Sequence, residues 1–66
     1  MKLYEVRILW AHDPYADAAL AWLDSKKWRS GRDWEIDMHG GRELYTSFWF
    51  KDLDKSLFMK LTIGGA

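Results

Sequence analysis

Acidic and imidazole side chains recur at two places that could hold a metal ion. Glu35, Asp37 and His39 alternate along one segment, and His12 stands next to Asp13. Carboxylate oxygens and imidazole nitrogens are common metal ligands, but a strand would place the alternating groups in a row, about 7 Å apart. We therefore interpret them as outward charges that protect a sheet edge and Asp13 as a helix cap, and we expect no metal or cofactor.

Basic residues gather around Trp28, at Lys26, Lys27, Arg29 and Arg32. A cationic patch beside an aromatic ring is typical of surfaces that bind the backbone of nucleic acids. These cations lie at the end of a predicted helix, however, where they stabilise the helix dipole, and acidic residues follow at once. We interpret the patch as a solvated helix end.

Residue types that could serve as nucleophiles stand in no recognisable motif. The chain has no cysteine, and no nucleophile motif surrounds its serines, which are Ser25, Ser30, Ser47 and Ser56. Gly40-Gly41 does not open a helix, so it does not form a phosphate-binding loop. We expect that the protein is not an enzyme.

The composition predicts one small domain, spanning residues 1–66, with a dense apolar core. Hydrophobic residues make up 48% of the chain and five are tryptophan, which compensates for the small size. Ten acidic and ten basic residues cancel, so no net field attracts nucleic acid or an anionic membrane. Apolar runs are far shorter than the roughly 20 residues of a membrane span. With no cysteine, we expect a soluble cytoplasmic protein.

The first half of the chain predicts a strand followed by a helix. Residues 2–11 alternate, with Tyr4, Val6 and Ile8 on one face, as in a half-buried strand. A helix is expected to begin with Asp13 as N-cap and Pro14 as its first residue. Its apolar stripe consists of Ala16, Ala19, Leu20 and Leu23, with Tyr15, Trp22 and Trp28 beside it.

Residues 33–39 and 43–50 predict a β-hairpin joined at the glycine pair. A two-residue loop would place acidic and aliphatic residues on the same face. A three-residue loop, Gly40 to Arg42, with a bulge instead aligns Met38 with Leu44 and gives one apolar face. This register turns six residues inward, which are Trp34, Ile36, Met38, Leu44, Phe48 and Phe50.

The last segment fits two secondary structures. Leu53, Leu57, Phe58 and Leu61 follow a helical stripe, with Asp52 as N-cap and Gly64 as C-cap. The same segment also alternates as a strand would from Leu57 onward. We favour the helix because a hairpin would leave Leu53 in an exposed turn.

These elements predict an α+β fold of the order βαββα, with a three-stranded antiparallel sheet and two helices on one face. The order resembles a ferredoxin-like fold without its last strand, in which the third strand lies between the first and the second.

Residues 48–65, FWFKDLDKSLFMKLTIGG, resemble the C-terminal ends of small uncharacterised proteins encoded by tailed phages. The shared features are an aromatic strand, an aspartate-capped helix and a Phe-x-x-Leu pattern, over the last third of the chain. The resemblance implies a phage-encoded protein in the host cytoplasm, and it implies no particular activity.

Two helices on one side leave the other face of the sheet uncovered. Apolar, aromatic and charged groups on one surface are typical of protein interfaces. We therefore expect a non-enzymatic module that docks on a host or viral protein, or on another copy of itself. The predicted contact residues are Leu3, Arg7, Leu9, Tyr45, Ser47 and Trp49.

Two alternatives stay open for this face. A small single-stranded nucleic-acid-binding protein would stack bases on Tyr45 and Trp49. These rings could instead lie flat on the sheet as packing, shielded by Arg7 and Leu9.

Overall fold

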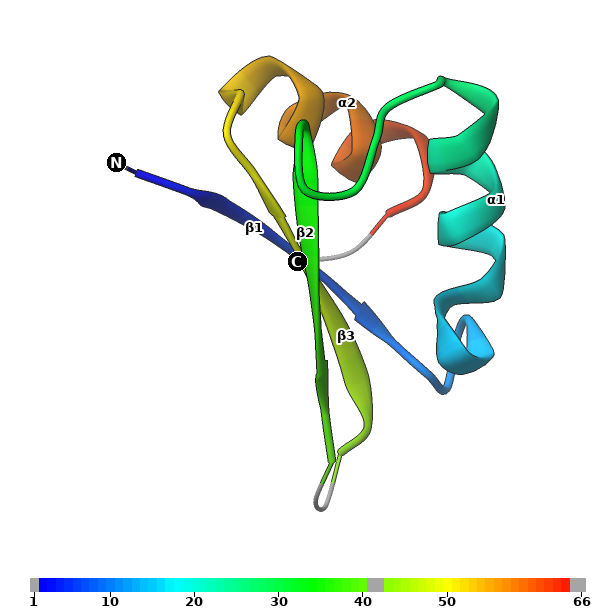
Figure 1. Ribbon diagram of the computed structural model, residues 1–66. Coiled ribbons are helices and arrows are strands. Elements are labelled where there is room, and N and C mark those ends of the chain that lie inside the picture. Colours follow the sequence, from blue (N-terminus) through cyan, green and yellow to red (C-terminus); the bar gives the residue numbers. More distant parts are fainter. Residues whose placement is uncertain (1, 41–42, 65–66) are drawn as a thin grey trace.

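The computed structural model describes residues 2–40 and 43–64 and has the predicted α+β class. Its elements are, in chain order, β1 (Tyr4–Leu9), the 3-10 helix η1 (Pro14–Ala16), α1 (Asp17–Ser25), β2 (Trp34–His39), β3 (Tyr45–Phe50) and α2 (Leu53–Thr62). Both helices lie on the same side of the sheet (Figure 1). The predicted βαββα order is confirmed, with η1 as an added turn before α1.

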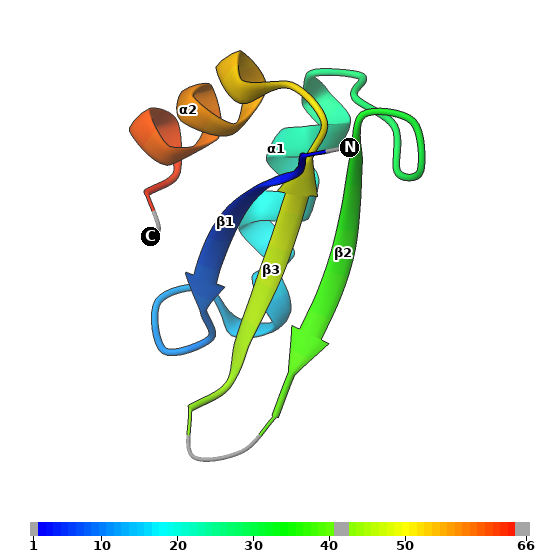
Figure 2. The same ribbon diagram turned by 90° about the vertical axis from the view of Figure 1, so that its left-hand side faces the viewer.

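The three strands form one antiparallel sheet in the order β1-β3-β2. The predicted central position of the third strand is confirmed, and Figure 2 shows the sheet from the side that the helices leave open. Both β1 and β2 are therefore edge strands, and β3 connects the two.

The predicted hairpin register is wrong by two residues. Met38 pairs with Thr46, not with Leu44, and the last pair joins His39 to Tyr45. The backbone N–H of Trp10 donates to the Leu44 carbonyl, so Leu44 extends the pairing with β1 instead. A shift of two residues leaves every side chain on its face, so the apolar pattern could not distinguish the two registers.

The hairpin connection is longer than predicted, since residues 40–44 separate the two paired strands. Gly41 and Arg42 of the predicted three-residue loop and its bulge lie outside the described residues. Leu44, predicted to face inward, precedes β3 and is 44% exposed.

The core lies between the sheet and the helices. It consists of Val6, Ile8, Ala16, Ala19, Leu23, Trp34, Phe48, Phe50 and Met59. Ile36 and Met38 face the helix side as predicted but remain 37% and 54% exposed. α2 and η1 pack on β1 and β3 and leave this part of β2 uncovered.

The first α-helix begins at Asp17, and the prediction that it begins at Pro14 is wrong. Tyr15 and Ala16 both have φ of 56°, in the left-handed region, and this interrupts the helix. The carboxylate of Asp13 still caps α1, because it accepts hydrogen bonds from the N–H groups of Ala18 and Ala19, both at 3.0 Å.

The last segment is a helix, as predicted. Asp52 caps it by accepting from the N–H of Asp54 at 2.9 Å. Gly64 follows the C-cap Ile63 with a φ of +96°, the left-handed conformation that commonly ends a helix.

The predicted buried face of α2 is wrong. The helix buries Ser56 and Met59 against the sheet. The predicted stripe remains exposed, at 45% for Leu53, 44% for Leu57, 43% for Phe58 and 88% for Leu61. Ser56 can face the core because its hydroxyl donates to the carbonyl of Leu53 at 2.7 Å and needs no partner from the sheet.

Candidate functional site

The sheet face opposite the helices carries nine side chains in three rows, which we call the outer face. Cross-strand pairing gives the rows Leu9, Tyr45 and His39; Arg7, Ser47 and Asp37; and Glu5, Trp49 and Glu35. Figure 2 looks onto this face, and no helix or strand of the described chain crosses it. β3 supplies the central residue of each row.

Tyr45 is held by both neighbouring strands. The guanidinium carbon of Arg7 lies 4.5 Å from the centre of the Tyr45 ring. The imidazole of His39 is stacked on the same ring, with centroids 4.4 Å apart and planes 15° apart. The ring is therefore fixed in orientation while remaining half-buried.

Trp49 lies between two glutamates, because its cross-strand partners are Glu5 and Glu35. Ser47, fully buried, donates to Oε2 of Glu5 at 2.5 Å, and Nη2 of Arg7 lies 3.5 Å from Oε1 of Glu5. Ser47 contributes to the face by holding Glu5, because its own side chain is not exposed.

The predicted contact residues occupy most of this surface. Arg7, Leu9, Tyr45, Ser47 and Trp49 belong to the three rows. Leu3 precedes β1 and is 39% exposed.

The prediction of contact residues omitted four members of the outer face, which are Glu5, Glu35, Asp37 and His39. Alternation in the sequence already turned all four outward. Their position beside Tyr45 and Trp49 depends on β2 and β1 flanking β3 in this register. The face consequently carries three carboxylates against one guanidinium.

The candidate metal ligands do not gather. Both carboxylate oxygens of Asp13 accept hydrogen bonds from N–H groups in the first turn of α1. Nε2 of His39 lies 3.2 Å from Oδ2 of Asp37, the one close pair among the predicted ligands in the part of the chain that the structure covers. Within residues 2–40 and 43–64, no three histidine or acidic side chains converge to form a cation site.

The same histidine does not complete a nucleophilic arrangement. Asp37, His39 and Ser47 share the outer face, but the Ser47 hydroxyl is buried and donates to Glu5. Because Ser47 has no exposed surface, a substrate cannot reach this hydroxyl. This cluster therefore offers binding groups and no accessible hydroxyl nucleophile.

The basic groups after α1 interact with groups of this chain. Nζ of Lys26 lies 4.8 Å from the centre of the Phe58 ring, and Nη2 of Arg32 lies 2.9 Å from the Asp33 carboxylate. The backbone N–H of Arg29, and then the Arg32 side chain, lower the pKa of Asp33 by donating to its carboxylate. These contacts account for much of the predicted basic patch.

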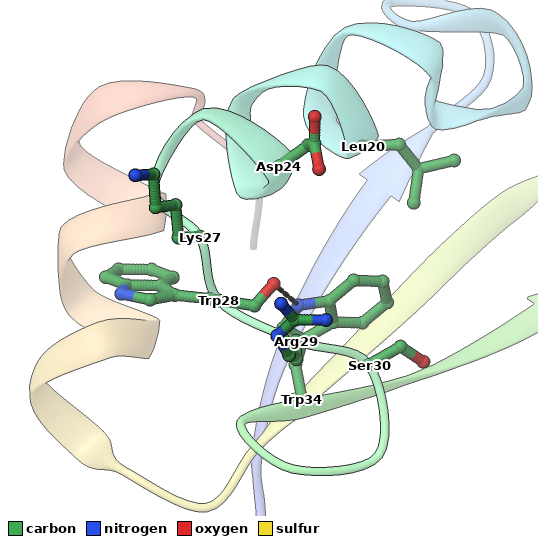
Figure 3. A pocket seen from close by; sticks show the side chains of 7 residues that line it. All are labelled: Leu20, Asp24, Lys27, Trp28, Arg29, Ser30 and Trp34. Carbon is green, nitrogen blue, oxygen red and sulfur yellow. Dashed lines mark hydrogen bonds between the residues drawn. The ribbon is translucent and has the colours of Figure 1, made fainter.

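A hollow of about 790 Å³ opens between α1 and the start of β2 (Figure 3). It is lined by Leu20, Asp24, Lys27, Trp28, Arg29, Ser30 and Trp34. The indole N–H of Trp34 donates to the carbonyl of Trp28 at 3.1 Å, which ties β2 to the preceding loop. None of these seven residues is a histidine or a cysteine.

Neither helix of the described residues is long and apolar enough to span a lipid bilayer.

The outer face thus presents two aromatic rings, one guanidinium and three carboxylates on a sheet whose backbone is fixed by hydrogen bonds. Such a surface can bind by stacking, apolar contact and ion pairing. Compared with protein-family models, with curated proteins and with solved structures, the chain has no match.

Proposed function

We propose that this protein is a non-enzymatic binding module that docks on a protein partner through the outer face. The observation that carries the proposal is the pair of half-buried rings, Tyr45 and Trp49, on a sheet face that no other described element covers. Tyrosine, tryptophan and arginine are the usual anchors of protein interfaces. Arg7 and His39 already fix the Tyr45 ring, so little side-chain entropy is lost on binding.

The charge of the outer face indicates the chemistry of the partner. Glu5, Glu35 and Asp37 outnumber Arg7, so a complementary surface carries lysine or arginine around an apolar group. The same carboxylates disfavour the nucleic-acid alternative, because Glu5 and Glu35 flank Trp49 and would repel a phosphate backbone.

We further propose a phage origin, on the resemblance of residues 48–65 to tailed-phage proteins. The partner is then a host or viral protein in the host cytoplasm. The mechanism is steric, since the module acts by occupying a surface of its target.

Capture of a partner by the immobilised 66-residue chain tests the proposal. Three chains are compared in the same host lysate: the wild type, Trp49→Ala and Met38→Ala. Met38 is the matched control, since it is a large apolar residue, 54% exposed, on the opposite face of the same sheet. We expect the wild type and Met38→Ala to recover the same partner and Trp49→Ala to lose it. Equal recovery by all three chains would exclude the outer face as the docking surface.

A titration with a single-stranded oligonucleotide, followed by tryptophan fluorescence, separates the two candidate functions. We expect no saturable change at moderate salt. Binding that weakens steeply with salt and disappears in Trp49→Ala would instead establish the nucleic-acid alternative.

A further inference from the structure

The free edge of β1 presents unpaired backbone groups. Trp10 donates to the carbonyl of Leu44, so the alternate residues Leu9, Arg7 and Glu5 direct their N–H and C=O groups away from β3. The following turn uses the Leu9 carbonyl, which accepts from two of its N–H groups. Glu5 and Arg7 therefore hold the free groups of this edge, and no strand of the described chain pairs with them.

Charge selects one pairing of this edge with β1 of a second copy. If the joined sheet is to have one outer face and one helix-covered face, each outer-face residue must lie opposite an outer-face residue of the second copy. Three antiparallel registers then pair the middle of the strand with itself. They place Glu5 opposite Glu5, Arg7 opposite Arg7, or Glu5 opposite Arg7 of the second copy. Only the last register joins opposite charges. The two-fold axis of such a dimer passes beside Val6, and the Glu5–Arg7 ion pair then forms twice, once on each side of the axis.

The same register also matches the apolar side chains. On the outer face, Leu3 lies opposite Leu9 of the second copy. On the helix side, Tyr4 lies opposite Ile8. The strand is therefore self-complementary on both of its faces.

The other sheet edge lacks this property. Outward alternation on β2 places Glu35 and Asp37 on the outer face, so every central antiparallel register of two β2 strands sets acid against acid. Like charges directly opposite each other destabilise strand pairing. The chain is thus protected from self-pairing at β2 and suited to it at β1.

The helix α2 supplies an apolar flank on the β1 side. Figure 2 shows α2 at this side of the sheet, with its C-terminal end beyond β1 and away from β3. Phe58 and Lys55 turn toward Trp28, so the exposed Leu53 and Leu57 lie on the opposite flank of the helix. Thr62, Ile63 and Gly64, at and just after the end of α2, line a hollow together with Arg7, Ile8 and Leu9 of β1.

We propose that two copies of this protein pair through β1 to form a symmetric dimer with one continuous six-stranded sheet. The dimer places two outer faces side by side on the same surface. This inference does not rest on the proposed function, because it is measured on the purified chain without a partner.

Charge exchange tests the register. The Glu5→Arg chain sets Arg7 against a new positive charge, and the Arg7→Glu chain sets Glu5 against a new negative one. With two affected pairs per dimer, we expect each variant to weaken association roughly tenfold or more. An equimolar mixture of the two variants restores opposite charges and should form a heterodimer, as should the double exchange with itself. Glu35→Arg, the same change at the other edge, is the control.

Sedimentation velocity measures the mass against that of the 7.8 kDa chain, and circular dichroism checks that each variant is folded. At a concentration near the wild-type dissociation constant, the proposal predicts that the wild type and Glu35→Arg contain dimer, that the single variants are mainly monomeric, and that the mixture contains dimer again. A monomeric wild type, dimeric single variants or a mixture that stays monomeric would each overturn it.

Amide hydrogen exchange gives a second readout that needs no variant. The N–H groups of Glu5, Arg7 and Leu9 should become protected as concentration rises, while those of Ile36 and Met38 on the free β2 edge should not. Concentration-independent exchange at Glu5 and Arg7 would contradict the dimer.

Discussion

Ser47 is a fully buried polar residue of the outer face, and its hydroxyl donates to the carboxylate of Glu5. Glu5 in turn pairs with Arg7, whose guanidinium lies over the Tyr45 ring. Small groups beneath the surface thus determine how the large groups on it are oriented. Contacts within the chain therefore hold the side chains of the outer face in place.

Asp13 caps α1 although η1 lies between them in the sequence. Asp13→Ala leaves two N–H groups of the first turn without their partner. We expect it to lower the free energy of unfolding by about 1 kcal/mol, measured by urea denaturation. Asp24→Ala, an exposed change late in the same helix, should have a smaller effect. Equal effects would show that the cap contributes nothing.

Two other aspartates make stability depend on acid. The pKa of both Asp33 and Asp52 lies below the ordinary 3.8, because backbone N–H groups donate to each carboxylate, with Arg32 and Lys55 as further partners. A carboxyl with a lower pKa in the folded chain stabilises it above the unfolded pKa and loses this contribution as pH falls through the folded pKa.

We therefore expect the free energy of unfolding to fall as the pH drops below 3.8. Urea denaturation at a series of pH values from neutral to about pH 2 measures it. The Asp33→Asn/Asp52→Asn chain should lose less stability over the same range. An identical acid profile for both chains would contradict the assignment.

At the scale of elements, the sequence pattern predicts that α2 is a helix, but packing determines which side of the helix is buried. Helical spacing, Asp52 and Gly64 predict the helix correctly from the sequence. The buried face could not be predicted, because Phe58 is held outside the core by Trp22 and Trp28. Ser56, a polar residue, occupies the sheet side instead.

Substitutions in α2 test this orientation. Met59 is fully buried and Leu61 is 88% exposed. Met59→Ala should lower the free energy of unfolding by about 2 to 5 kcal/mol, and Leu61→Ala by no more than about 0.5 kcal/mol. Chemical denaturation of the two chains measures the difference. A larger loss from Leu61→Ala would mean that the helix is turned the other way.

In the strands, too, the sequence predicts one property, the face of each residue, and not another, its partner on the next strand. Alternation predicts which residues of β1, β2 and β3 share a face, and a register error of two residues preserved those faces. Pairing across strands is a property of the whole sheet. The stacking of His39 on Tyr45 therefore could not be predicted from either segment alone.

At the scale of the whole molecule, a net charge of zero conceals an uneven distribution. The outer face has three carboxylates and one guanidinium, whereas Lys27 and Arg29 border the hollow beside α1. The composition alone argues against nucleic-acid binding, because a net charge of zero produces no attractive field. The placement of the charges adds a second argument, since the face with the aromatic rings is the acidic one.

The central claim is that this acidic, aromatic face binds a protein. The most direct measurement is the amount of partner recovered by Trp49→Ala relative to the wild type, with Met38→Ala in parallel and the thermal midpoint of each chain checked. We predict a loss of roughly tenfold or more for Trp49→Ala, as for an interface hot spot, and no change for Met38→Ala. Recovery by Trp49→Ala equal to that of the wild type, from a chain of unchanged stability, would contradict the account.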